Sequence, residues 1–473
     1  MDSFQTLRRL ASIIMDSVTT MERVYTQSEM SPPSLDEPFN AQDPAEALRQ
    51  EPEVSDAIRN IVAAAAQISA TVCDPMRVAV NTSHAFHISS CLLAASDLNV
   101  VEILREAGPK GIDATAIAAP SNVDPARILR LLATHHIFRE VSPGVFANNR
   151  ISSTLDKGKP SGVLFSNRAD RLTGSSGVAA LVEHTADIAG KSGVYLSDTL
   201  LNPTGRIPFN VAYGTEEGLF PWFQRPENRY NVSRFAVAMQ GTAATEPQDM
   251  IFQGMLQSCF TSFDWGKLPP NGTIVDVGGG IGYISLMIAK KYPHLRVVNQ
   301  DLGAPTELSK AYWKEHFPGH LDKKMVEFQV HDFFTPQPKT EPTIFLMKYI
   351  LHDWPDDQAT VILKHLRAAA LPNTKLVLIE KILPFASAED VVASTTKHIP
   401  GASRPTAESP LLPNWGAATA DLYLYDLTMH VLLGGVERTL EGFWDVLAQS
   451  GWRLDEVHHC SGSQLSHLVA SPI

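Results

Sequence analysis

The sequence predicts an α/β fold in which a mainly helical N-terminal half is followed by a mainly parallel sheet flanked by helices. Three observations support this prediction. From Thr273 onwards, short runs rich in β-branched residues alternate with helical segments, as is typical of a parallel sheet. A glycine-rich turn directly follows the first run, at residues 278–282. Before residue 266 the pattern is mostly helical, apart from a segment rich in proline and acid at 26–56 and one short hairpin.

The first β-α-β unit spans Thr273–Asp301, with strands predicted at 274–277 and 296–299 and a helix at 284–291. Glycines let the backbone approach a ligand closely, and the helix N-terminus presents free N–H groups. Asp301, after the second strand, can accept hydrogen bonds from a ribose diol. The unit is therefore Rossmann-like.

Two cofactor classes fit such a unit, dinucleotides and S-adenosylmethionine (SAM). A dinucleotide site needs the spacing G-x-G-x-x-G, but Gly278 and Gly280 are followed by Gly282, one position too early. Asp276 would place a negative charge near a pyrophosphate, whereas it suits a positively charged sulfonium amino acid. The unit therefore favours SAM.

The rest of the sheet follows the same alternation. Further strands are predicted at 326–330, 344–347 and 376–379, helices at 308–316 and 358–370, and a terminal antiparallel strand pair at 454–458 and 465–470. The segment 384–415 is rich in Ser, Pro and Ala and predicts a long loop. Ligands bind at the carboxyl ends of parallel strands, so we expect one site there, built from the glycines after Val277 and from Asp301, Asp332, Lys348, His352 and Glu380.

The N-terminal half predicts three regions. We predict a flexible extension at residues 1–56. It has a helix at 1–25, and the segment after this helix is rich in proline and acid, a composition typical of flexible chain. Residues 57–160 predict a winged-helix-like dimerisation domain, with Ala-rich helices, two short helices at 114–119 and 125–134, and a hairpin at 138–147. Residues 161–265 predict a helical connecting region that lines the substrate site, before the SAM-binding domain at 266–473.

The bulk composition excludes several partners. The 473 residues carry a net charge of −12, and the second short helix is largely apolar, so nucleic acid is not an expected partner. The longest apolar run, 61–72, is too short to span a bilayer, and the N-terminus lacks a secretory pattern. We expect a cytoplasmic protein.

The four cysteines, Cys73, Cys91, Cys259 and Cys460, lie far apart in the sequence. We therefore predict that they are free thiols.

SAM chemistry predicts the catalytic residues. Methyl transfer to a neutral hydroxyl requires loss of the hydroxyl proton, and the pKa of a phenol is about 10 whereas that of histidine is about 6.5. A positioned histidine would therefore remove the proton as the methyl group moves. A carboxylate on the other ring nitrogen would hold the tautomer. His352 is the predicted base, with Glu380 and Glu437 as candidate carboxylates.

The C-terminal half resembles the plant and fungal caffeate-type O-methyltransferases, a SAM-dependent, metal-independent family. Besides Asp301, the matching motifs are VDVGGGIG at 275–282, HDFF at 331–334, FLMKYILHDWPDD at 345–357, IEKILP at 379–384 and GGVERTLEGF at 434–443. The winged-helix half resembles the dimerisation domain of that family, which implies a homodimer. The resemblance implies that Gly278 and Gly280 lie against SAM, Asp301 holds the ribose, Asp332 and Phe333 flank the adenine, Lys348 touches the amino-acid end, and Glu380 and Glu437 bracket His352 as the base.

These observations predict a SAM-dependent O-methyltransferase that acts on a hydroxylated aromatic or polyketide-like secondary metabolite. The alternative is a methyltransferase-like pericyclase or dehydratase, which the complete histidine–glutamate set disfavours without excluding it. A non-enzymatic winged-helix regulator is disfavoured by the acidic charge balance. Metal-assisted transfer is disfavoured because Asp353, Asp356 and Asp357 read as the start of a helix, where acids are favourable.

Overall fold

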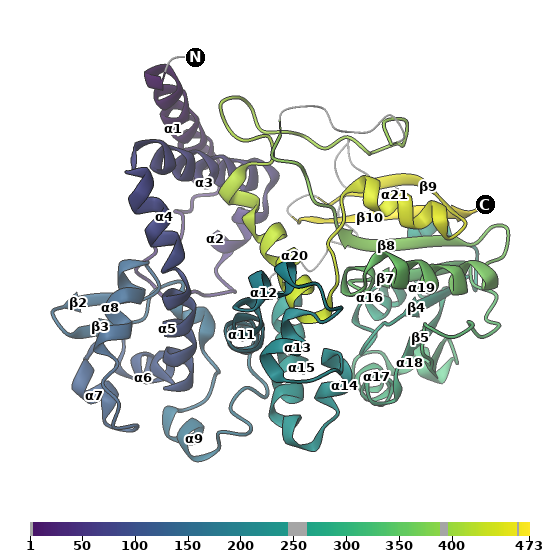
Figure 1. Cartoon of the computed structure of the whole chain (residues 1–473), viewed down its shortest axis with the longest axis horizontal. Helices are drawn as coiled ribbons and strands as arrows, with labels where there is room; N and C mark the ends of the chain where they lie inside the picture. The colour runs from purple at the N-terminus through teal and green to yellow at the C-terminus, as the bar shows by residue number, and fades with distance from the viewer. Residues whose placement is uncertain (1–2, 245–262, 388–395, 461–462) are drawn as a thin grey trace. The chain divides into compact units, whose positions relative to one another are not determined.

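A computed structural model describes residues 3–244, 263–387, 396–460 and 463–473. The chain divides into two compact units, Met1–Gln248 and Asp249–Ile473. They are described separately below, and Figure 1 shows the elements of both. Of the sequence features noted above, Cys259 lies outside the described residues.

The second unit is built on a seven-stranded sheet in the order β6-β5-β4-β7-β8-β10-β9. The first five of these strands are parallel, and β10 runs antiparallel to both β8 and β9. In Figure 1 the C-terminal β10 lies beside β8, which precedes it by a long stretch of chain. The strands are β4 (Thr273–Val277), β5 (Arg296–Asp301), β6 (Val326–Val330), β7 (Ile344–Lys348), β8 (Lys375–Lys381), β9 (Trp452–His459) and β10 (Leu465–Pro472). The predicted sheet and its terminal antiparallel pair are confirmed.

Helices cover both faces of this sheet because its central strands are apolar on both sides. Val275 and Val277 belong to a buried cluster with residues of α19 and α21, whereas Ile274 packs with residues of α16. The helices of this unit are α16 (Tyr283–Lys291), α17 (Gly303–His316), α18 (Pro318–Asp322), α19 (Asp356–Ala369), α20 (Ala420–Leu433) and α21 (Leu440–Gln449). Asp356 and Asp357 occupy the first turn of α19, where the helix dipole favours acids, whereas Asp353, predicted with them, lies in the preceding 3₁₀ turn. The predicted loop at 384–415 has neither helix nor strand in its described part.

The register of the parallel strands places the predicted site residues along one edge. Asp301 pairs with Val330 at the end of β5 and β6, and Lys348 pairs with Ile379 at the end of β7 and β8. Glu380 follows Ile379 directly, and the glycine turn follows Val277. The carboxyl ends therefore meet as predicted.

The first unit contains a three-stranded sheet in the order β1-β3-β2, packed with α6, α7 and α8. The predicted helix pair and hairpin are confirmed, and β1 is an additional two-residue strand. The elements up to this sheet are α1 (Ser3–Gln27), α2 (Pro44–Ala47), α3 (Pro52–Val72), α4 (Pro75–Ser83), α5 (Phe86–Asp97), α6 (Val100–Ala107), β1 (Ile112–Asp113), α7 (Ala114–Ala118), α8 (Ala126–Thr134), β2 (Arg139–Ser142) and β3 (Val145–Ala147). Those after it are α9 (Ser161–Ser166), α10 (Val178–His184), α11 (Gly190–Gly193), α12 (Leu196–Leu201), α13 (Pro208–Tyr213), α14 (Leu219–Phe223) and α15 (Arg229–Ala244).

The N-terminal extension makes defined contacts within this unit. Tyr25, Ala45 and Val54 form a small buried cluster, in which the Tyr25 hydroxyl donates a hydrogen bond to Ala45 O at 3.0 Å. The Arg150 Nε donates to Glu46 Oε1 at 2.8 Å. The predicted boundary at residue 56 falls inside α3. The flexibility of residues 1–56 and the division into four regions stay predictions.

A helix that spans a bilayer needs about 20 predominantly apolar residues. None of the described helices alone is long and apolar enough to cross one. One pair, Pro75–Asp97 with Val100–Ala107, meets the length and composition requirement together, with a bend of 64° between its members. The predicted compartment stays a prediction.

Candidate active site

The glycine turn after β4 combines tight packing with open space. Gly278 and Gly280 have φ angles of 67° and 57°, which an L side chain rarely adopts. A Cβ atom at Gly278 would lie 2.6 Å from Ile350 Cδ1, whereas a Cβ at Gly280 would meet no atom within 4 Å. Packing therefore requires a glycine at 278, and the turn is open beside Gly280.

Asp301 reaches from the end of β5 back to this turn. Its Oδ2 accepts a hydrogen bond from Gly280 N at 2.8 Å, and its Oδ1 accepts one from Leu302 N at 2.7 Å. Burial raises the pKa of Asp301, and these two hydrogen bonds act in the opposite direction. Asn299, which was not predicted, donates from Nδ2 to Gly280 O and to Ser309 Oγ, both at 3.0 Å. The available signal was a polar residue directly after the β-branched pair Val297–Val298.

The other predicted cofactor residues lie along the same edge. Phe333 Cε1 is 3.5 Å from the place a Cβ of Gly278 would take. Asp332 is exposed, and its Oδ1 accepts from Phe334 N at 2.9 Å. Burial raises the pKa of Asp276 to about 6, although hydrogen bonds from Ser285 and the positive charge of Lys348 oppose this shift. Within the described part of the chain, Asp276 Oδ2 is buried without a hydrogen-bond partner.

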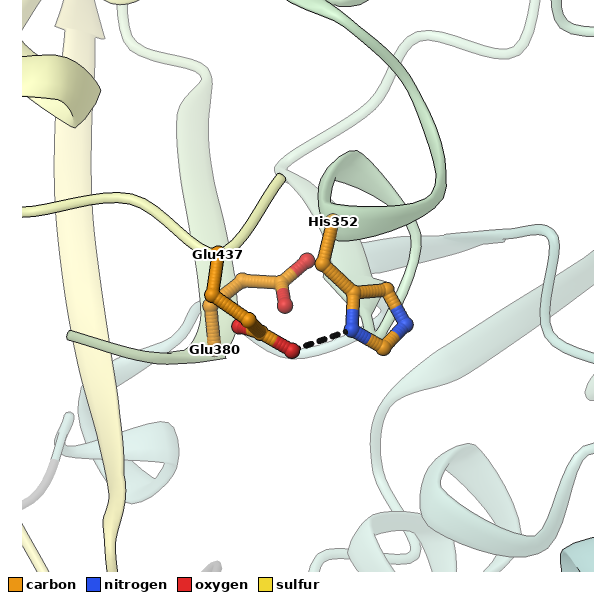
Figure 2. A group of neighbouring side chains, drawn as sticks. All are labelled: His352, Glu380 and Glu437. Carbon is orange, nitrogen blue, oxygen red and sulfur yellow. Dashed lines mark hydrogen bonds and ion pairs between the residues drawn. The ribbon is translucent and has the colours of Figure 1, made fainter. Parts of the chain in front are cut away.

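His352, Glu380 and Glu437 come together from three segments of the second unit, as Figure 2 shows. His352 lies in a short 3₁₀ turn, Leu351–Asp353, after β7. Its Nδ1 is 2.8 Å from Glu437 Oε1, and the two side chains are 12% and 1% exposed. Glu380 Oε1 accepts from Ile350 N and Leu351 N, each at 3.0 Å. The predicted triad is therefore one contiguous group, in which both glutamates are buried and His352 is partly buried.

Electrostatics favour a charged imidazole in this group. Burial lowers the pKa of His352, but the charge of Asp353, the hydrogen bond with Glu437 and the charge of Glu380 raise it to about 9. Burial raises the pKa of Glu380 to about 7 and that of Asp353 to about 6, and the His352 charge opposes both shifts. His352, Glu380 and Glu437 each offer one atom of a type that can ligate a metal ion. These three atoms all lie within 4.8 Å of one another, which is close enough to bind one ion.

Asp426 and Val436 support the triad and were not predicted from the sequence. Asp426 Oδ1, from α20, accepts from Glu437 N at 2.9 Å. Val436 N donates to His352 O at 2.9 Å. These contacts fix the backbone on both sides of the His352–Glu437 hydrogen bond.

Comparison with known proteins identifies the family. Residues 194–399 match the O-methyltransferase domain, and residues 80–158 match the O-methyltransferase dimerisation domain. An O-methyltransferase of Armillaria gallica is 39% identical over 483 aligned positions, which cover 99% of each chain. The chain belongs to the O-methyltransferase family. A second relative of this O-methyltransferase, 4-O-methyltransferase 1 of Phanerochaete chrysosporium, is 37% identical over 96% of this chain and 95% of its own. The predicted resemblance is confirmed.

Solved structures confirm the fold. The mitomycin 7-O-methyltransferase MmcR superposes with a TM-score of 0.62 at 24% identity, covering 86% of this chain and 99% of its own. A pericyclic reaction enzyme reaches the same TM-score of 0.62 at 19% identity, covering 90% and 97%. At this level of identity the likeness concerns the fold and does not separate the two reactions.

The O-methyltransferase takes its methyl group from SAM, as its family does. The edge of the sheet suits this cofactor. Gly280 leaves open space at the start of α16, the Asp301 carboxylate has lone pairs left for hydroxyl groups, and the unpartnered Asp276 oxygen suits a positive charge. The individual roles predicted for the site residues stay predictions.

Proposed function

We propose that this O-methyltransferase methylates a hydroxyl group of an aromatic or polyketide-like secondary metabolite, with His352 as general base and without a metal ion. The observation that supports this proposal is the partly buried 2.8 Å contact between His352 Nδ1 and Glu437 Oε1. A carboxylate on Nδ1 fixes the tautomer in which Nε2 accepts a proton. Nε2 is 3.4 Å from Asp353 Oδ1, so a carboxylate also faces the nitrogen that becomes charged.

The chain's own residues would perform the proton chemistry. Bound SAM would supply an electrophilic methyl group held on a sulfonium. His352 Nε2 would accept the proton of the acceptor hydroxyl as that oxygen takes up the methyl group. Glu437 and Asp353 then stabilise the imidazolium, and general base catalysis of this kind contributes about 10²–10⁴-fold. Gly278, Gly280, Asp301, Asp332, Phe333 and Lys348 are the residues proposed to hold SAM.

A homodimer is part of this proposal. The match of residues 80–158 to a dimerisation domain supports it. So does α4, which has no buried residue and carries Met76 and Val80 at 75% and 54% exposure. Burial of such side chains against a second copy would remove apolar surface from water.

The product mass tests the proposal. The enzyme is incubated with host metabolite extract and SAM labelled in its methyl group, with His352→Ala in parallel and a chelator in a third sample. The expected product is one methyl group heavier, carries the label, survives the chelator and is lost in the variant. A product of unchanged mass, or one lighter by water, that forms without label would instead establish a pericyclic or dehydrating enzyme.

A further inference from the structure

Arg438 is a buried arginine that follows Glu437 directly in the chain. Its side chain is 2% exposed, and its guanidinium donates three strong hydrogen bonds. Nη1 donates to Leu351 O at 2.7 Å, Nη2 to Trp354 O at 2.8 Å, and Nε to Asp356 Oδ1 at 2.9 Å. Two neutral carbonyls and one carboxylate therefore hold the charge.

These acceptors belong to residues on both sides of His352 in the chain. Leu351 precedes it and Trp354 follows it by two residues, so the guanidinium spans the turn on which the imidazole stands. Gly435 approaches the same turn closely, since a Cβ there would lie 2.2 Å from His352 O. The side chain of Arg438 thus fastens the turn that carries His352 to the segment that carries Glu437.

The backbone of Arg438 reaches the third residue of the triad. Its O atom accepts from Leu383 N at 2.9 Å, and it forms a parallel bridge with Ile382. Ile382 lies two residues beyond Glu380. One residue therefore contacts the segments that carry His352, Glu380 and Glu437.

We propose that Arg438 is a positioning residue that sets the distance between His352 and Glu437 through its three-way fork. This inference rests on the proposed function. Only a guanidinium offers donors in several fixed directions, whereas a lysine ammonium is a point charge on a flexible stem. All three acceptors lie within residues 351–356, on the turn that carries His352 and directly after it, so this geometry indicates a role in the site.

Arg438→Lys tests the geometry because it conserves the charge. A displacement of about 1 Å can cost about 10²-fold in rate, so we expect kcat to fall about 10- to 100-fold while KM for SAM and acceptor changes less than about threefold. The control is Arg367→Lys. Arg367 likewise binds backbone carbonyls, those of Gly451 and Ile473, near the other end of α19.

A second readout does not depend on turnover. The imidazole of His352 is titrated by NMR with labelled histidine, and His352→Ala assigns its signal. The charged groups that raise its pKa are Asp353, Glu437 and Glu380, and the ring of Tyr349 is stacked on the imidazole. Asp426 accepts a hydrogen bond from Glu437 N, and Asp356 accepts one from Arg438. In Arg438→Lys the midpoint should move towards the ordinary value of about 6.5, because Glu437 no longer sits at hydrogen-bond distance, and in Arg367→Lys it should stay.

The outcomes separate the two proposals. If the parent enzyme transfers no labelled methyl group, the proposed function fails, but the titration still decides whether Arg438 holds His352 against Glu437. If Arg438→Lys has the kcat and titration midpoint of the parent, or if Arg367→Lys changes as much, the positioning role is overturned. If Arg438→Lys and Arg438→Ala both fail to fold, the role of Arg438 is structural and the inference is overturned as well.

Discussion

The ring of Tyr349 is stacked on the imidazole of His352, with 5.1 Å between the ring centroids and 23° between the planes. Tyr349 has a φ of 54°, a left-handed conformation that costs a non-glycine residue about 1–2 kcal/mol. Lys348 Nζ lies 4.2 Å from the centroid of the same ring. The strained residue therefore links the proposed base with a residue proposed to hold SAM.

Removing this ring should slow turnover without unfolding the protein. Aromatic pairs contribute about 0.5–1.5 kcal/mol beyond their buried area, so Tyr349→Leu should lower kcat about 3- to 10-fold as the imidazole gains freedom. Tyr349→Phe keeps the ring and is the control, with kcat expected near that of the parent. Equal kcat values for the leucine and phenylalanine variants would show that the stack has no part in the reaction.

The pH dependence should follow His352. Its pKa of about 9 means that the imidazole is protonated at neutral pH in the free enzyme. Only the neutral form accepts a proton, so kcat/KM for the acceptor should rise from pH 7 and level off above about 9. A profile that is flat from pH 7 to 9 at a constant rate-limiting step would contradict the assignment of His352 as base.

Glu380→Gln should move this profile to lower pH. Burial raises the pKa of Glu380 to about 7, so its carboxylate is charged in the range where His352 titrates. Removing that charge lowers the pKa of His352, and the rising limb should then appear at lower pH. Glu315→Gln, on the exposed side of α17, is the control and should leave the profile in place. A profile of Glu380→Gln that coincides with the control would exclude this coupling.

All seven strands of the larger sheet could be predicted within a few residues. Parallel strands buried on both faces are near-continuous apolar runs, which distinguishes them from the helical segments around them. The two-residue strand β1 has too few residues to show a periodicity. The composition of residues 26–56 suggested loose chain, but composition does not reveal that Tyr25, Ala45 and Val54 meet in a small core.

The strand pattern predicts only the site residues that follow strands, whereas Glu437, between α20 and α21, was predicted as a candidate carboxylate for His352. Asp301 lies beside Gly280 because the ends of parallel strands meet at one edge, which the strand pattern already implies. Asn299 and Arg438 were not predicted as site residues. Their partners are mainly backbone carbonyls that folding brings near, and no residue type in the sequence marks a carbonyl that needs a donor.

Asp301→Ala should weaken SAM binding. Hydrogen bonds to charged groups contribute about 1.5–3 kcal/mol, so the dissociation constant measured by calorimetry should increase about 10- to 100-fold. Asp455→Ala removes a carboxylate on β9 that pairs with Lys375 and serves as the control. An unchanged affinity in Asp301→Ala, at the same folded fraction as the control, would remove the proposed ribose role.

Gly280→Ala and Gly282→Ala separate cofactor contact from packing within one turn. Both positions have positive φ, 57° and 73°, so the backbone strain is similar. A Cβ at Gly282 would lie 2.4 Å from Trp313 Nε1, whereas one at Gly280 would enter open space. Gly282→Ala should therefore lower Tm further, by several degrees, since overpacking costs about 1–3 kcal/mol.

Gly280→Ala should instead show its main effect on SAM. Its methyl group would occupy the space proposed for the cofactor, so the dissociation constant should rise at least about tenfold while Tm of the free enzyme falls less than in Gly282→Ala. Thermal unfolding with and without SAM measures both effects on one sample, because a ligand at free concentration L stabilises the folded state by RT ln(1 + L/Kd), so a weaker-binding variant gains less Tm at the same SAM concentration. If SAM raises the Tm of Gly280→Ala as much as that of the parent, the cofactor does not occupy the open space beside Gly280.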